Sequence, residues 1–255
     1  MKEAKVFMLI IAWVVSQSTL QGQVDSIPKK QDCKATKIIG IALPSAMITY
    51  GLISLGDNSV RQIDYNVHNS LEQNNRFWHI SAEDYIQFAP AVAAYSLKFC
   101  KVNNSNSLLD MTILYGLSNA VAGCIVQGGK FIIGRERPDN SNNLSFPSGH
   151  TETAFVAAEF LHQEYKDKSV WISVGGYAAA TFVGVARVYN NKHWVSDVVT
   201  GAGIGILSTK AVYWVYPYLQ EIYEKQFGKK DKPLHALVFP EYSNGNLGLA
   251  LSYTF

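Results

Sequence analysis

Three short polar clusters interrupt an otherwise apolar chain and hold the residues best suited to chemistry. In chain order they are Lys130-x6-Arg137-Pro138, Pro147-Ser148-Gly149-His150 and Arg187-x5-His193-x3-Asp197. Cationic side chains bind phosphate oxygens, an imidazole can attack phosphorus or move a proton, and a carboxylate can orient an imidazole. Together the clusters predict a site for phosphoryl transfer that needs no metal.

The third cluster supplies the candidate nucleophile. His193 and Asp197 are four residues apart, so both side chains share one face if a helix begins near Trp194. Asp197 is then expected to hold one ring nitrogen of His193 and leave the other free to attack phosphorus. Arg187 ends the preceding apolar segment, from where its guanidinium could grip phosphate oxygens in a bidentate manner.

The second cluster precedes a predicted helix over residues 152–165. Ser148 is the expected N-cap, and Gly149 lets the backbone approach an anion closely, so amide protons would face a phosphate there. His150 lies in the first turn, where it could protonate a leaving oxygen. Taken alone, this motif is equally typical of ordinary helix capping.

The first cluster closes an apolar helix that Pro138 is expected to stop. Lys130 and Arg137 are about two helical turns apart, so both could point toward one loop face. Without the other clusters, the same residues would indicate cations at the edge of a membrane.

Six apolar segments must position these clusters. They are Ile38–Leu55, Ile86–Cys100, Leu108–Ile133, Thr153–Leu161, Val170–Val188 and Val195–Leu219. The longer ones reach the roughly 20 residues that cross a hydrocarbon core, and their glycines and alanines suit close helix packing in lipid. They predict an all-α, membrane-embedded bundle of about six apolar helices. A soluble bundle stays open, because Lys98 and Lys210 interrupt the segments and mean hydropathy is only +0.02.

The ends of the chain differ from this middle. Residues 1–22 resemble a signal peptide, with lysines before a short apolar run. A helical phosphatase domain is expected over 23–227, with its motif core at 108–219, and residues 57–84 are interpreted as an interfacial connector. Residues 228–255 are a polar linker followed by a β-like tail, which could form a hairpin around Asn244-Gly245.

Charge limits the partners and gives a conflicting topology. A net charge of +2 without a basic stripe predicts no nucleic-acid partner. Lysines in the connecting loops would put all three clusters on the outer side of a membrane by the positive-inside rule. A cleaved signal peptide would instead put the lysines at 29–37 outside, and the sequence does not resolve this conflict.

With the three clusters in this order, residues 108–219 resemble the type 2 phosphatidic acid phosphatase superfamily, which includes lipid phosphate phosphatases, class A acid phosphatases and vanadium haloperoxidases. The resemblance implies that His193 forms a phosphohistidine, that Asp197 orients it and that His150 is the general acid. It also implies that no cofactor is needed and that the phosphoryl oxygens are bound by Lys130, Arg137, Ser148, Gly149 and Arg187. One departure is Ala186, where the family usually has serine.

The resemblance leaves the substrate open. A phosphorylated membrane lipid is expected, with lipid A first and undecaprenyl diphosphate or phosphatidylglycerol phosphate next, because the sequence is similar to exported lipid A phosphatases. The expected location is the inner membrane of the cell envelope, with the site facing the periplasm. Alternatives are a soluble periplasmic acid phosphatase, a vanadate-dependent haloperoxidase and a non-catalytic phosphate-binding membrane protein; no oligomeric state is predicted.

Overall fold

The computed structural model describes residues 34–74, 81–104, 106–227, 235–243 and 246–254. The chain divides into two compact units, residues 1–41 and 42–255, and each is described by itself. In the first unit the described residues are the opening turns of α2 (Lys34–Ile53). The predicted signal peptide at residues 1–22 lies outside the described residues.

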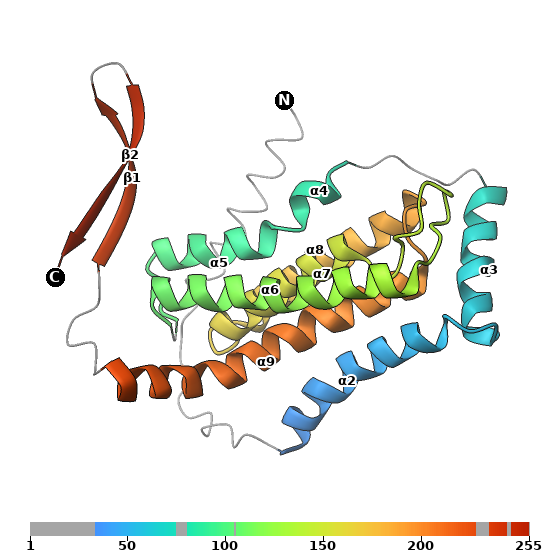
Figure 1. Ribbon diagram of the computed structural model, residues 1–255, viewed down its shortest axis with the longest axis horizontal. Coiled ribbons are helices and arrows are strands. Elements are labelled where there is room, and N and C mark those ends of the chain that lie inside the picture. The colour runs from blue at the N-terminus through green and yellow to red at the C-terminus, as the bar shows by residue number, and fades with distance from the viewer. Residues whose placement is uncertain (1–33, 75–80, 105, 228–234, 244–245, 255) are drawn as a thin grey trace, which may run out of the picture. The chain divides into compact units, whose positions relative to one another are not determined.

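The second unit is a helical bundle with a C-terminal β-hairpin (Figure 1). Each of the six predicted apolar segments contains one helix, which confirms the predicted all-α bundle. After α2 the elements are α3 (Ser59–Gln73), α4 (Glu83–Ile86), α5 (Ala89–Phe99), α6 (Leu108–Ile133), α7 (Gly149–Tyr165), α8 (Val170–Tyr189), α9 (Val195–Phe227), β1 (His235–Ser243) and β2 (Asn246–Thr254).

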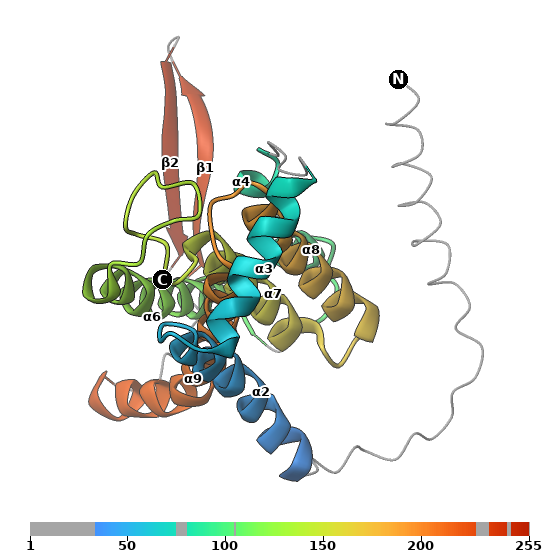
Figure 2. The ribbon, with the colours of Figure 1, turned by 90° about the vertical axis from the view of Figure 1, so that its right-hand side faces the viewer.

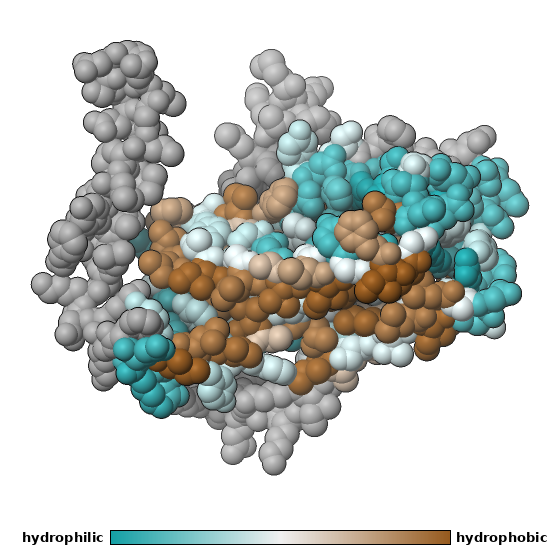
Figure 3. All heavy atoms as spheres, in the orientation of Figure 1, coloured by the Kyte–Doolittle hydropathy of each residue, from teal (hydrophilic) through white to brown (hydrophobic). Residues whose placement is uncertain are grey.

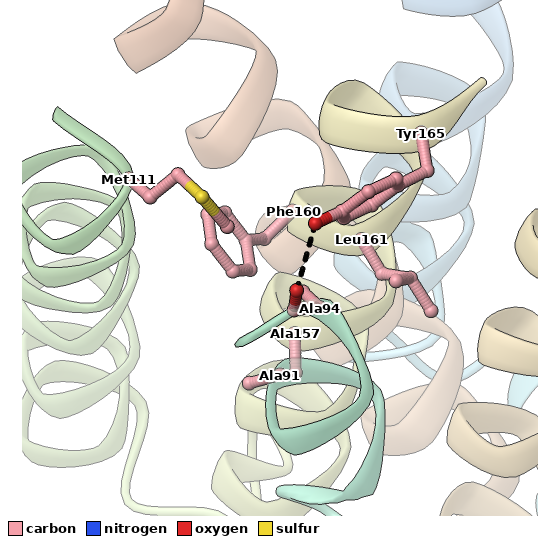
Figure 4. Close-up of a cluster of buried hydrophobic side chains, with 7 residues drawn as sticks. All are labelled: Ala91, Ala94, Met111, Ala157, Phe160, Leu161 and Tyr165. Carbon is pink, nitrogen blue, oxygen red and sulfur yellow. Dashed lines mark hydrogen bonds between the residues drawn. The ribbon is translucent and has the colours of Figure 1, made fainter. Parts of the chain in front are cut away.

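Helix α7 is the centre of the bundle and packs against α5, α6, α8 and α9 (Figures 1 and 2). Small residues allow this packing: Ala91 and Ala94 of α5 are buried in one cluster with apolar residues of α7. The phenol of Tyr165 donates a hydrogen bond of 2.9 Å to the carbonyl of Ala94. Figure 4 shows this cluster, which comprises Ala91, Ala94, Met111, Ala157, Phe160, Leu161 and Tyr165.

Two glycines of α9 fix the contact with the first turns of α7. A Cβ on Gly201 would lie 2.4 Å from the carbonyl oxygen of Ser148, and one on Gly205 would lie 2.6 Å from that of Glu152. Only glycine fits so close to a neighbouring backbone. The start of α7, which carries the second motif, is thereby held directly against the start of α9.

The outward face of α6 is apolar. From Leu109 to Ile125 every fourth residue is an exposed large hydrophobic one, and an apolar band covers this part of the surface (Figure 3). The described residues include three helices long and apolar enough to cross a membrane: Leu108–Ile133, Val170–Tyr189 and Val195–Gln226. By the length and composition of these helices, the chain is a membrane protein.

Lys210, which favoured a soluble bundle in the sequence, is paired inside the helical bundle. Its ammonium lies 2.8 Å from the carboxylate of Glu159, whose side chain is fully buried on α7. The Tyr177 phenol of α8 also donates to this carboxylate. A buried, hydrogen-bonded ion pair is compatible with a membrane interior, so Lys210 does not argue against spanning helices.

The predicted C-terminal hairpin is confirmed. Strands β1 and β2 are antiparallel, with Val238 opposite Leu251 and Ser243 opposite Asn246. Residues 244–245, between the two strands, lie outside the described residues.

Residues 57–84, interpreted from the sequence as an interfacial connector, form α3 and α4 in their described part. Asn58 caps α3 by accepting hydrogen bonds from the amides of Val60 and Arg61. Two side chains within the segment, Asp64 and Glu83, are almost fully buried. Buried carboxylates require partners, and both find them among the residues of the three motifs.

Candidate active site

The motifs meet at one cavity of about 440 Å³ near the end of α6 and the start of α7. Five of the eight predicted site residues line it: Lys130, Arg137, Gly149, His150 and His193. The remaining lining residues are Gln87, Asn119, Gly123, Val126, Gln127, Glu152 and Thr153. Ser148, Arg187 and Asp197 do not line the cavity, and their contacts are described below.

His193 lies in the loop before α9 and is only 2% exposed. Its Nδ1 lies 2.8 Å from the carbonyl oxygen of Ser145. A carbonyl can only accept, so Nδ1 carries the proton and Nε2 keeps a free lone pair. The pKa of His193 is lowered to about 4: burial is the largest cause, Asp197 opposes it, and the charges of Arg187 and Lys130 act in the same direction as burial. The imidazole is therefore neutral at neutral pH, as a nucleophile must be.

Asp197 supports His193 less directly than the sequence predicted. Its carboxylate is 3.6 Å from Nδ1 of His193, which is too long for a hydrogen bond. Instead it accepts from the Ser145 hydroxyl at 2.5 Å and from the amide of Trp194 at 3.0 Å. Asp197 thus fixes both the loop that holds His193 and the backbone next to it.

Arg135 is a functional candidate that the sequence reasoning missed. Its guanidinium donates to Asp197 at 2.7 Å and to Asp64 of α3 at 2.8 Å. Asp64 also accepts a 2.9 Å hydrogen bond from the amide of Ser196. Arg135 stands two residues before Arg137, but no spacing rule distinguished a structural arginine from a phosphate-binding one.

The first motif reaches the cavity by a turn and not along a helix. Helix α6 ends at Ile133, and Gly134 caps it with a left-handed φ of 60°. The expectation that Pro138 stops the helix was therefore wrong, since glycine adopts that conformation without strain four residues earlier. The loop carries Arg137 back to the cavity, and the Lys130 ammonium donates to the Leu144 carbonyl at 2.8 Å.

The second motif begins α7, as predicted, but its serine acts differently. Ser148 occupies the N-cap position, yet its hydroxyl pairs with that of Thr151 at 3.0 Å instead of capping the helix. Its amide donates to the backbone carbonyl of Asp197 at 3.1 Å. The first amides of α7 have no acceptor within the helix, so they are available to an anion beside Gly149.

Two carboxylates of α4 contact predicted site residues. Glu83, which is 2% exposed, accepts from Arg187 at 3.3 Å and also from Asn190. Asp84 lies 2.9 Å from Nε2 of His150. Burial lowers the pKa of His150, as does the charge of Arg187, whereas Asp84 and Glu83 raise it. These contacts could not be predicted from the sequence, because α4 is distant from the motifs along the chain.

Two arginines keep unused donors beside this cavity. Among the described residues, the Nε atoms of Arg137 and Arg187 are buried without an acceptor. A buried guanidinium donor that lacks a partner is costly unless a ligand supplies one. The same described part of the chain contains no cluster of three or more metal-ligating side chains.

Residues 112–221 match the model of the PAP2 superfamily. This part of the chain belongs to that superfamily. Over 139 residues, or 54% of this chain and 31% of the relative, it is 41% identical to the lipid A 1-phosphatase of Porphyromonas gingivalis. Over 89 residues, or 29% of this chain and 43% of the relative, it is 38% identical to the phosphatidylglycerophosphatase B of Bacillus subtilis.

Among solved structures, the chain is similar to the transmembrane PAP2 type phosphatidylglycerolphosphate phosphatase of Bacillus subtilis. That similarity has a TM-score of 0.46 at 19% identity and covers 75% of this chain and 100% of the other. The chain spans less than half the length of both curated relatives. The match of residues 112–221 confirms, at the level of the superfamily, the resemblance inferred from the three motifs.

Proposed function

We propose that this PAP2 chain is a metal-independent phosphatase that hydrolyses a phosphorylated membrane lipid through a phosphohistidine. The observation that carries the proposal is the cavity itself. It is lined by a neutral His193, Lys130 and Arg137. The Nε atoms of Arg137 and of the adjoining Arg187 are buried donors that lack an acceptor. A phosphoryl group supplies the missing acceptors and the electrophile.

The residues divide into two steps. In the first, the Nε2 lone pair of His193 forms a bond to phosphorus while the bond to the leaving oxygen breaks, and His150 gives that oxygen its proton. In the second, His150 takes a proton from water, whose oxygen attacks phosphorus and breaks the P–N bond. The cations Lys130, Arg137 and Arg187, with the first amides of α7, stabilise charge on the phosphoryl oxygens.

A lipid substrate is supported by the surroundings of the cavity. It lies at the end of α6, whose outer face is apolar over the span of a bilayer, so acyl chains could stay in the membrane while the phosphate enters. Lipid A is the first candidate, since one relative is a lipid A 1-phosphatase. Undecaprenyl diphosphate and phosphatidylglycerol phosphate follow, and the proposed orientation has the site facing the periplasm.

Phosphate release from defined lipids tests the activity. The purified chain in detergent micelles should release inorganic phosphate from lipid A, and His193→Ala should abolish the release. EDTA should leave the rate unchanged, because cationic side chains replace a metal; strong inhibition would contradict metal independence. Mass spectrometry of envelope lipids from cells with and without the gene should then name the physiological substrate.

The alternatives give different results in the same assays. A soluble acid phosphatase would extract without detergent and cleave p-nitrophenyl phosphate as readily as lipids. A haloperoxidase would bind vanadate and oxidise bromide. A non-catalytic binding protein would retain lipid phosphate without releasing phosphate.

A further inference from the structure

Helix α4 brings two consecutive carboxylates to two different cationic groups of the site. Glu83 contacts Arg187 on α8, and Asp84 contacts His150 at the start of α7. Helix α4 lies outside residues 112–221, so the family model covers neither of the two carboxylates. Glu83 is buried and anchors α4, whereas the side chain of Asp84 is 53% exposed at the rim.

We propose that Asp84 is a positioning residue of the phosphatase reaction, which holds the His150 imidazole and favours its protonated form. This inference rests on the proposed function, in which His150 is the general acid. Asp84 engages Nε2 of His150 at 2.9 Å. The nitrogen left to donate to the leaving oxygen is then Nδ1, and the direction of proton transfer is fixed.

The other charges around His150 show why a carboxylate is needed there. Arg187 of α8, together with Lys130 and Arg137 of the cavity lining, disfavours a further positive charge on His150. Burial of His150 lowers its pKa in the same direction. Against these stand Asp84 and Glu83 of α4, and Glu83 is already engaged by Arg187 and Asn190. Two other titratable groups, Glu152 of α7 and the neutral imidazole of His193, also line the cavity. Asp84 is the carboxylate in direct contact with the imidazole.

The position of Asp84 also determines the expected size of its effect. The His150 side chain is 36% exposed, so water screens the pair. A neutral partner should therefore lower the pKa of His150 only modestly. Activity should be almost unaffected at acidic pH, where His150 is protonated in any case, and should fall at alkaline pH.

The test compares Asp84→Asn with a matched control, Asp57→Asn, which removes an exposed carboxylate in the loop before α3. The kcat/KM of the wild type and both variants is measured against pH with a lipid phosphate in micelles and with p-nitrophenyl phosphate. For Asp84→Asn on the lipid substrate, the alkaline limb of the kcat/KM profile should move to lower pH by about 0.5–1 unit. At pH values above that limb, kcat/KM should be roughly three- to tenfold lower than in the wild type. p-Nitrophenyl phosphate should lose much less, because p-nitrophenolate leaves without protonation. Asp57→Asn should match the wild type.

Two results would overturn the inference while leaving the proposed function intact. One is a wild-type pH profile in an active Asp84→Asn variant. The other is an equal loss on both substrates at every pH, which indicates a structural role. A wild-type chain that releases no phosphate from either substrate would overturn the proposed function and this inference together.

Discussion

Nδ1 of His193 donates to a backbone carbonyl, and this arrangement changes which residues control the proposed nucleophile. The carbonyl belongs to Ser145, whose hydroxyl donates to Asp197. Asp197 is in turn held by Arg135, and Arg135 by Asp64. The orientation of the imidazole therefore depends on a chain of buried contacts that reaches α3.

Arg135→Lys tests that chain of contacts. Lysine cannot make the two diverging bonds to Asp64 and Asp197, so His193 should lose its orientation. Steady-state kinetics should show kcat reduced about 10- to 100-fold with KM little changed. Thermal unfolding should show a loss of about 3 kcal/mol, because buried carboxylates lose a partner. Arg61→Lys, a partly buried arginine of α3 that bonds to Tyr65 and Leu55, is the control. Wild-type kcat in Arg135→Lys would contradict this account of the nucleophile.

Glu152 adds a second response to pH, this time in the stability of the chain. Burial raises the pKa of this carboxyl to about 7, although Thr153 and Lys130 work against the shift. The folded chain keeps the proton up to about pH 7, whereas the unfolded chain loses it near 4.5. Stability from this group is thus present below pH 4.5 and is lost as the pH rises through 7. The free energy of unfolding of Glu152→Gln should match that of the wild type at pH 4 and exceed it at pH 8 by on the order of 2–3 kcal/mol, measured by thermal unfolding in detergent. An equal change at both pH values would contradict the assignment.

Residue types and spacings in the sequence were enough to predict that the three motifs gather, and five of the eight predicted site residues line one cavity. The residues that hold them in place could not be predicted from the sequence. Asp64, Glu83 and Asp84 stand in a polar stretch where carboxylates are usually solvated, and only the folded path of α3 and α4 brings them to the site. The exact partner of His193 also depended on the course of a loop, which spacing alone does not determine.

At the scale of elements, the close approach of α9 to α7 joins the second and third motifs. Gly201 of α9 lies against the carbonyl of Ser148, and the amide of Ser148 donates to the carbonyl of Asp197. Helix positions were well predicted because apolar segments are long and continuous, and the bounds of α6 agree with the sequence to the residue. Which glycines serve packing and which are incidental was not visible in the sequence.

Gly201→Ala tests this contact. A methyl group 2.4 Å from a backbone oxygen cannot be accommodated unless α9 moves, so overpacking should destabilise the chain by about 1–3 kcal/mol. Displacing α9 should also lower kcat, since it moves Asp197. Gly175→Ala is the matched control, because nothing lies within 4 Å of its added Cβ, and it should be neutral or slightly stabilising. The measurements are thermal unfolding in detergent and phosphate release; equal behaviour of the two variants would refute the packing argument.

At the scale of the whole molecule, the three motifs gather near the ends of spanning helices, which agrees with a site at one membrane surface. Lys168 stands before α8 and Arg187 near the end of that helix, about 30 Å apart along a 20-residue helix. The two positions should therefore lie on opposite sides of a bilayer. Which side of the membrane the site faces could not be predicted from the sequence, because the signal peptide and the lysine pattern indicate opposite orientations.

Cysteine labelling tests the proposed orientation. The three native cysteines are replaced by serine, and a single cysteine is introduced at exposed Asn143 in the loop after α6 or at exposed Lys168. In right-side-out membrane vesicles, an impermeant maleimide should label Asn143→Cys at once and Lys168→Cys only after permeabilisation. The reverse pattern would put the site on the cytoplasmic side, and labelling of both would argue against a spanning α8.

Trapping the covalent intermediate tests whether His193 attacks phosphorus. The wild-type chain is mixed with ³²P-labelled lipid phosphate and quenched within the first turnover. A phosphoprotein should form that survives alkali but not acid, with the label on the peptide that contains His193, and it should be absent from His193→Gln. Label on any other residue, or full turnover by His193→Gln, would contradict attack by His193.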